Sequence, residues 1–173
     1  MSASLAVICN QHGTDTDETT SRLLEGITSQ GVRTSLFSTQ DVITNIDELE
    51  QFSGFVFEAE SSQSLDKIID AFNGASALKN KAGLWRDKLA AGFSHSAHSA
   101  AVSLRAMIDF SFFCNSQNMI WLSSGIESME AEHIANKVTS SVGNAPILDN
   151  VMYQAYRHGQ YLARVARQWQ PDC

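Results

Sequence analysis

The sequence predicts an α/β protein in which helices cover both faces of a five-stranded parallel β-sheet. Three observations lead to this prediction. Short apolar runs recur along the chain, at residues 5–9, 34–37, 54–57, 89–93 and 119–122. Segments with the helical spacing of apolar residues separate most of these runs. The two prolines of the chain, Pro146 and Pro171, lie outside every predicted strand and helix.

The first half of the chain alternates between strands and helices. Residues 5–9 predict a buried strand, because they are continuously apolar. Residues 16–30 predict an amphipathic helix, because apolar residues recur on one of its faces, and Gly31 stands where a helix C-cap is expected. Residues 34–37 predict the second strand, and residues 46–51 predict one or two helical turns.

The second half repeats this alternation and closes with a helix. The remaining predicted strands are at residues 54–57, 89–93 and 119–122, and the predicted helices are at 65–72, 100–113 and 150–169. Residues 123–150 are expected to be irregular, with a candidate helix at 129–138. We find no linker, repeat or low-complexity segment, so we expect a single domain over residues 1–173.

Composition and charge exclude several classes of partner. The chain is 43% apolar and carries a formal charge of -7, so it lacks the basic stripe that binds nucleic acid or an anionic membrane surface. No apolar run approaches the roughly 20 residues of a membrane span. The N-terminus lacks a signal-peptide pattern. Because Cys9, Cys114 and Cys173 are isolated from one another, we expect a reducing compartment and a cytoplasmic protein.

Ligands of such a sheet bind at the carboxyl ends of the strands, where three polar loops are predicted. In the first loop, the hydroxyl groups of Thr14, Thr16 and Thr19 and the N-terminus of the next helix favour a phosphate. The carboxylates of Asp15, Asp17 and Glu18 oppose a phosphate if they point inward. If they point outward, they stabilise the helix dipole, and Thr16 or Asp17 is the N-cap. Both alternatives stay open at this point.

Several stretches of the sequence resemble one protein family in their order and spacing. These stretches are residues 5–26, 66–72, 83–85, 88–94, 119–122 and 153–163. The sequence resembles the NAD(P)H:quinone oxidoreductases of the WrbA type (the tryptophan-repressor-binding-protein family). The resemblance implies a flavodoxin-like three-layer sandwich with strand order 2-1-3-4-5. It also implies FMN as cofactor, NAD(P)H as co-substrate, a quinone as electron acceptor, and a homodimer or homotetramer.

The same resemblance implies the residues of the ligand site. The implied cofactor-binding residues are Asn10, His12, Gly13, Thr14, Thr16, Thr19, Glu58, Ser61, Ser94 and Ser96. His95 and His98 are the candidate catalytic residues, and our hypothesis is that one of them donates a hydrogen bond to the flavin ring edge or to the substrate. No residue is assigned to a metal. The implied reaction is hydride transfer from NAD(P)H to the flavin and then to a quinone.

Two alternatives to this function remain. The second and third loops, at residues 58–64 and 94–99, contain no glycine. The first alternative is therefore a divergent protein of this fold that has lost FMN and acts as an interaction module. The histidines at predicted strand ends, His12, His95 and His98, also lie in loops near carboxylates. Histidine and carboxylate ligands can bind a transition metal, so the third alternative is a metal-dependent enzyme.

Overall fold

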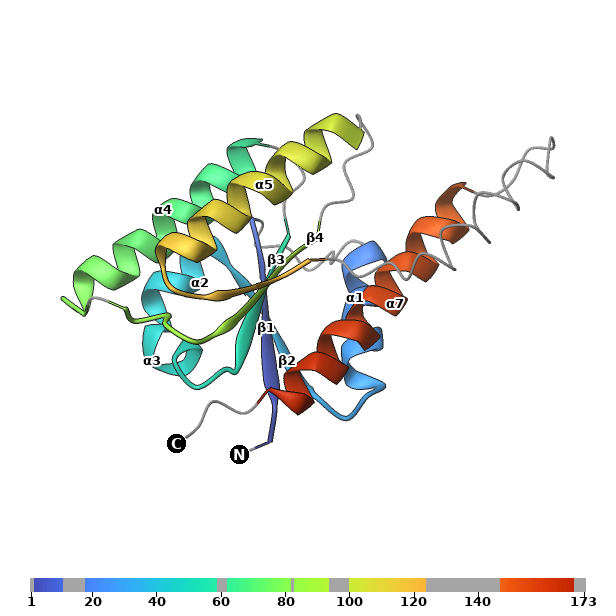
Figure 1. Cartoon of the computed structure of the whole chain (residues 1–173), viewed down its shortest axis with the longest axis horizontal. Helices are drawn as coiled ribbons and strands as arrows, with labels where there is room; N and C mark the ends of the chain where they lie inside the picture. Colours follow the sequence, from blue (N-terminus) through green and yellow to red (C-terminus); the bar gives the residue numbers. More distant parts are fainter. Residues whose placement is uncertain are drawn as a thin grey trace.

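The computed structural model describes residues 2–10, 18–58, 62–81, 83–93, 100–123 and 147–169. These residues form one five-stranded parallel sheet with the strand order β2-β1-β3-β4-β5 (Figure 1). The predicted α/β class and the predicted strand order are both confirmed. None of the helices in these residues is long and apolar enough to cross a membrane.

The bounds of the strands agree with the sequence prediction to within one residue at each end. The strands are β1 (Ser4–Cys9), β2 (Arg33–Ser38), β3 (Gly54–Glu58), β4 (Leu89–Phe93) and β5 (Ile120–Leu122). The helices are α1 (Glu18–Thr28), α2 (Thr39–Thr44), α3 (Ile46–Leu49), α4 (Ser62–Leu78), α5 (Ala100–Ser116) and α7 (Ile147–Gln168). The candidate helix at residues 129–138 lies outside the described residues.

Two helices differ clearly from the prediction. Helix α2 was not predicted, although a capping box starts it: the Asp41 backbone N–H donates to the Ser38 hydroxyl, and the Ser38 N–H donates to the Asp41 carboxylate. Helix α4 is longer than the predicted residues 65–72. Beyond Phe72 its buried position is Ala75, which is too small to give a clear apolar period in the sequence.

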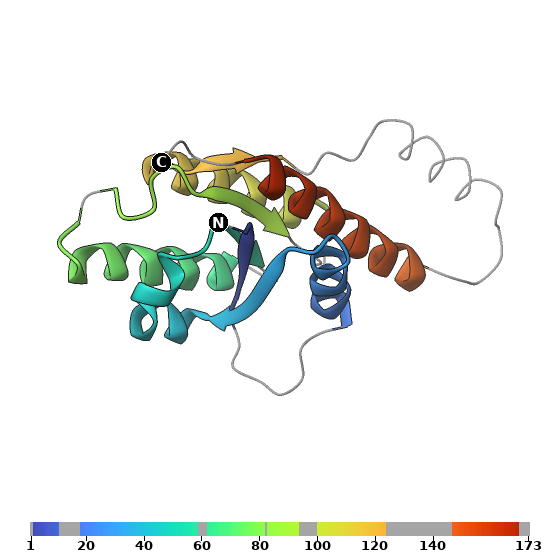
Figure 2. The same ribbon diagram turned by 90° about the horizontal axis from the view of Figure 1, so that it is seen from below.

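Helices cover both faces of the sheet, and the two resulting cores differ in composition. Helices α2, α4 and α5 lie on one face, and α1 and α7 lie side by side on the other (Figures 1 and 2). The first core is aromatic: the rings of Phe55 and Phe72 are 5.1 Å apart, and those of Phe57 and Phe110 are 5.3 Å apart. The second core consists mainly of aliphatic residues and alanines, so its helices can approach closely.

The close contact between α1 and α7 depends on two glycines in the middle of helices. A Cβ atom added to Gly26 would collide with the backbone carbonyl oxygen of Tyr156. A Cβ atom added to Gly159 would collide with the backbone carbonyl oxygen of Leu23. Because backbone, and not a flexible side chain, would have to move, neither position accepts a larger residue without separating the helices.

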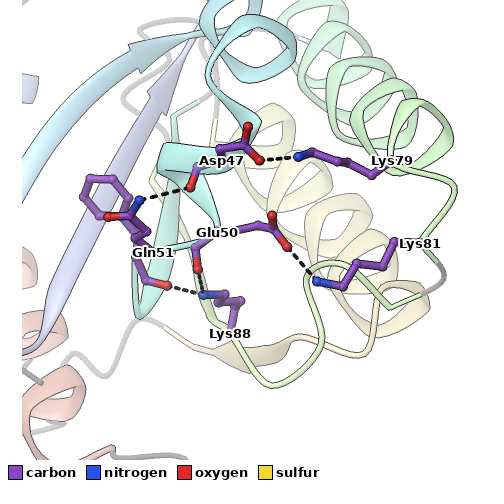
Figure 3. Close-up of polar contacts among 7 residues, drawn as sticks. Asp47, Glu50, Gln51, Lys79, Lys81 and Lys88 are labelled. Atoms are coloured by element: carbon purple, nitrogen blue, oxygen red, sulfur yellow. Dashed lines mark hydrogen bonds and ion pairs between the residues drawn. The ribbon is translucent and has the colours of Figure 1, made fainter.

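Lysines join the segment around α3 to the rest of the fold at the amino edge of the sheet (Figure 3). Lys79 pairs with Asp47, and Lys81 Nζ lies 2.7 Å from Glu50 Oε1. Lys88 donates to the backbone carbonyls of Glu50 and Phe52, each at 2.5 Å, and its burial lowers the pKa of its ammonium group. Lys88 therefore satisfies carbonyls at the end of α3 that the short helix leaves free.

Substitution by alanine should affect stability differently at two helical glycines, Gly26 in α1 and Gly74 in α4. Gly26→Ala should lower the free energy of unfolding by about 1–3 kcal/mol, the usual range for overpacking a filled interior. The matched control is Gly74→Ala in α4, where the new Cβ would lie 3.7 Å from Ile43 Cδ1, an ordinary contact. That change should be neutral or stabilise the protein by up to about 1 kcal/mol. Urea denaturation measures both, and equal effects of the two substitutions would contradict the close helix contact.

Candidate functional site

The carboxyl ends of the central strands meet at the edge of the sheet where the predicted loops begin. Strand β1 lies between β2 and β3, and the chain leaves it through α1 on one face and returns to β3 through α2 and α3 on the other. The strand order therefore reverses beside β1, which is where ligands of open α/β sheets bind. Asn10 follows β1, and Glu58 ends β3, so both border this position.

Only part of the predicted site lies in the described residues. Asn10, Thr19 and Glu58 are described, and the structure brings them to the same edge of the sheet through β1, α1 and β3. The other predicted site residues lie outside the described part, and they remain predictions: His12, Gly13, Thr14, Thr16, Ser61, Ser94, His95, Ser96 and His98.

A buried carboxylate lies against the first turn of α1. Glu58 is only 5% exposed, and the hydroxyl of Thr20 donates a hydrogen bond to its Oε1. Side chains alternate along β3, and Val56 packs in the core under α1 and α7, so Glu58 lies on that same face. The N-terminal end of α1 carries a partial positive charge, which stabilises a carboxylate placed beside it.

Thr20 was missed by the sequence analysis, although a signal for it exists. Thr20, Leu23 and Ile27 are all buried and recur at helical spacing along α1. The periodicity thus places the Thr20 hydroxyl on the inner face of the helix. Its neighbour Thr19, which the sequence analysis did select, is also buried, with 4% exposure. The first turn of α1 therefore holds two buried threonines, and the hydroxyl group of one of them, Thr20, contacts Glu58.

The side-chain oxygen Oδ1 of Asn10 is buried at the end of β1 and has no hydrogen-bond partner among the described residues. A buried amide oxygen without a donor costs free energy, so such a group at a strand end favours a ligand or a loop that supplies the donor. This position agrees with the prediction that Asn10 contributes to a binding site. The prediction itself stays open, because the following loop lies outside the described residues.

A second group that sequence reasoning missed is the imidazole of His158 in α7. Its ring stacks on that of Phe93 at the end of β4, with centroids 6.0 Å apart, and it donates a hydrogen bond to the Gly92 carbonyl. The other ring nitrogen, Nε2, is buried without a partner among the described residues. Burial lowers the pKa of His158 to about 4, so the ring is neutral at pH 7 and Nε2 holds a lone pair.

His158 of α7 packs over the strand next to the one that Glu58 ends. Glu58 and Phe93 are register partners in the β3–β4 ladder, and Phe93 carries the stacked imidazole. This edge therefore holds a carboxylate at the end of β3 and a neutral imidazole stacked on the last residue of β4. The spacing of His158 from Ala155 and Leu162 in the sequence could have shown that it belongs to the inner face of α7, as both neighbours are buried.

The described residues do not gather a metal site. No group of three or more histidine, cysteine or acidic side chains with metal-binding geometry occurs in these parts of the chain. The three histidines on which the metal alternative rests are outside them. Of the cysteines, Cys114 is buried in the aromatic core, where burial raises the pKa of its thiol to about 12 and makes it a poor nucleophile.

Comparison with known proteins identifies the fold and leaves the family open. No protein-family model matches the sequence, and no curated protein matches it. Among solved structures, the flavodoxin, WrbA-like protein from Agrobacterium tumefaciens is 18% identical, with a TM-score of 0.68, and the match covers 98% of this chain and 100% of that protein. A diflavin flavoprotein from Nostoc sp. matches with a TM-score of 0.56 at 15% identity, over 96% of this chain and 94% of that one.

A third structural match is a flavone reductase, which is 14% identical with a TM-score of 0.61, over 97% of this chain and 66% of that protein. At these identities the matches show the fold alone. The chain has the flavodoxin-like fold that the sequence predicted, and its strand order is that of the prediction.

The buried, neutral His158 predicts a loss of stability in acid. Because its pKa is lowered from 6.5 to about 4 on folding, the unfolded chain binds the proton first. The contribution is complete above pH 6.5 and is lost as the pH falls to about 4; at roughly 1.4 kcal/mol per pKa unit it amounts to about 3 kcal/mol. We expect His158→Asn, whose amide nitrogen takes the place of Nδ1 and so keeps a donor for Gly92 but does not titrate, to flatten the unfolding free energy over this interval by that amount. Identical pH profiles of the two proteins would show that the imidazole is not buried neutral.

Proposed function

We propose that this chain is a flavin-dependent oxidoreductase that binds the flavin at the carboxyl edge of β1, β3 and β4. The observation that supports it most is the first turn of α1, which lies at the reversal of strand order and carries the buried Thr19. Proteins similar in fold include a flavodoxin, a diflavin flavoprotein and a flavone reductase, which support the same proposal by analogy.

The described residues at this edge fit FMN in part. The hydroxyl group of Thr19, the amide of Asn10 and the N-terminus of α1 suit a phosphate and the ribityl chain. The carboxylate of Glu58 suits hydroxyl groups better than a phosphate, because it can only accept hydrogen bonds when ionised. The ribityl chain thus fits the described edge, and the phosphate meets one unfavourable group, Glu58.

In the proposed reaction, the flavin supplies the two-electron redox chemistry, with NAD(P)H as electron donor and a quinone or a similar small molecule as acceptor. This chain's own residues bind and orient the flavin and keep water from its polar end. The loops at residues 58–62 and 94–99 are proposed to contact the ring, with His95 or His98 donating a hydrogen bond to the ring edge or to the substrate. We further propose a homodimer or homotetramer in the cytoplasm.

One specific observation favours the alternative in which the fold has lost its flavin. Glu58 already places a carboxyl group against the first turn of α1, near the helix end where flavodoxin-type proteins are expected to hold the phosphate. A chain that satisfies this helix end with its own carboxylate needs no cofactor to complete the fold. In that case the protein acts as an interaction module, and it should bind neither FMN nor riboflavin.

A flavin titration tests the proposed function. We expect the wild-type protein to quench flavin fluorescence and, when loaded, to oxidise NADH or NADPH in the presence of a quinone. Thr19→Ala should weaken binding by about tenfold, the value of one hydrogen bond to a charged or polar ligand group. The matched control is Thr28→Ala at the opposite, exposed end of the same helix, where the hydroxyl only bonds to backbone carbonyls; it should leave binding unchanged. Absence of quenching by the wild-type protein would reject the proposal.

A further inference from the structure

Helix α5 lies on the outside of the molecule, over the aromatic core (Figure 1). Its inner face packs into that core, yet its outer face also carries apolar side chains: Phe112 is 69% exposed and Ile108 is 42% exposed. A helix that is apolar all round is normally buried on all sides. In the described parts of the chain, each other exposed large apolar residue stands singly on its helix or strand, which is ordinary at a protein surface: Leu36, Ile43, Leu78 and Tyr153.

The two charged residues of α5 neutralise each other on this same face. Arg105 Nε lies 2.8 Å from Asp109 Oδ2, one helical turn further along the chain. Because successive residues of a helix are about 100° apart, this ion pair and the two apolar residues fall within one sector of about 100°. We call these four residues the α5 outer face: Arg105, Ile108, Asp109 and Phe112. The chain has a formal charge of -7, which opposes association of two copies, but the α5 outer face brings no net charge to a contact.

The order of these residues matches itself when two such helices lie antiparallel. With a two-fold axis at the level of Met107, Arg105 and Asp109 are each two residues from the axis, so each lies opposite the other in the second copy. The two Ile108 side chains then meet beside the axis. Phe112 lies further out and covers the first half of the other helix. A second copy thus supplies a carboxylate for Arg105, a guanidinium for Asp109 and apolar cover for the rest.

We propose that the α5 outer face is an interface between two copies of this chain, with their α5 helices antiparallel around a two-fold axis. Ile108 and Phe112 are withdrawn from water there, and the Arg105–Asp109 pair within each helix gains a counterpart between the copies. Because both copies bury the same patch, the contact closes as a dimer. This inference rests on the homo-oligomer of the proposed function, names its surface, and does not depend on flavin binding.

Sedimentation equilibrium of the wild type and of Phe112→Asp tests the apolar part of the interface. We expect the wild type to self-associate, and the dissociation constant of the pair to rise at least about thirtyfold in the variant, the effect of leaving one large apolar side chain unburied. Leu78→Asp is the matched control, because Leu78 is 67% exposed on the neighbouring helix α4 and the change in charge is the same. It should leave association unchanged. Thermal unfolding checks that both variants are folded.

An exchange of charges tests the pairing between copies. Arg105→Asp and Asp109→Arg each bring like charges together in both ion pairs across the interface, so each variant alone should self-associate more weakly than the wild type. Mixed in equal amounts, with a mass tag on one of them, the two variants should associate with each other at least about tenfold more tightly than with themselves. The pair within each helix stays broken in the mixture, so it cannot cause this recovery.

The possible results separate the interface from the flavin site. A monomeric wild type would overturn the inference together with the proposed homo-oligomer, and flavin titration of the same sample decides independently whether the oxidoreductase proposal stands. If Phe112→Asp also lowers the thermal stability of that monomer, another segment of the chain covers the α5 outer face. Unchanged association of Phe112→Asp would overturn the inference by placing the interface elsewhere. Absence of recovery in the mixture of charge variants would overturn the antiparallel pairing.

Discussion

The burial of β1 and β3 on both faces is the constraint on which the other features of this protein depend. In β1, Leu5, Ala6, Val7 and Ile8 are at most 2% exposed, and the apolar residues of β3 are similarly buried. Such strands are stable only if helices cover both faces of the sheet, and parallel neighbours then require crossover connections. As a consequence, every strand ends at the same edge. The polar residues that follow the strands are brought together there, whatever their distance along the chain.

The two faces meet this constraint in different ways. The face under α2, α4 and α5 is filled by interlocking aromatic rings, including Trp85, which is completely buried and therefore belongs to the core. The face under α1 and α7 is filled by smaller residues, and the two glycines let the helix backbones touch. The closeness of α7 to the sheet also explains why His158 is held against Phe93 and Gly92 with one ring nitrogen enclosed.

The flavodoxin-like fold alone does not decide which ligand the chain binds, since function depends on the groups at the edge. Here the described edge combines buried hydroxyl groups, a carboxylate and a neutral imidazole. Hydroxyl groups and a helix N-terminus are compatible with many anions, so they do not select one ligand class by themselves.

The sequence by itself determined the α/β class and the positions of all five strands, because short apolar runs and helical periods are local signals, and its resemblance to a family of flavodoxin-like proteins implied the strand order. It also selected Asn10, Thr19 and Glu58 as edge residues, because each follows or borders a predicted strand or helix end. It missed α2, whose start depends on a short capping box, and the full length of α4, whose second half is lined by small residues. Only the tertiary structure paired Glu58 with Thr20 and placed His158 beside Phe93. The residues of the first contact are 38 positions apart in the sequence, and those of the second are 65 positions apart, so no local pattern encodes either contact. Both exist because the sheet and two helices pack against one another.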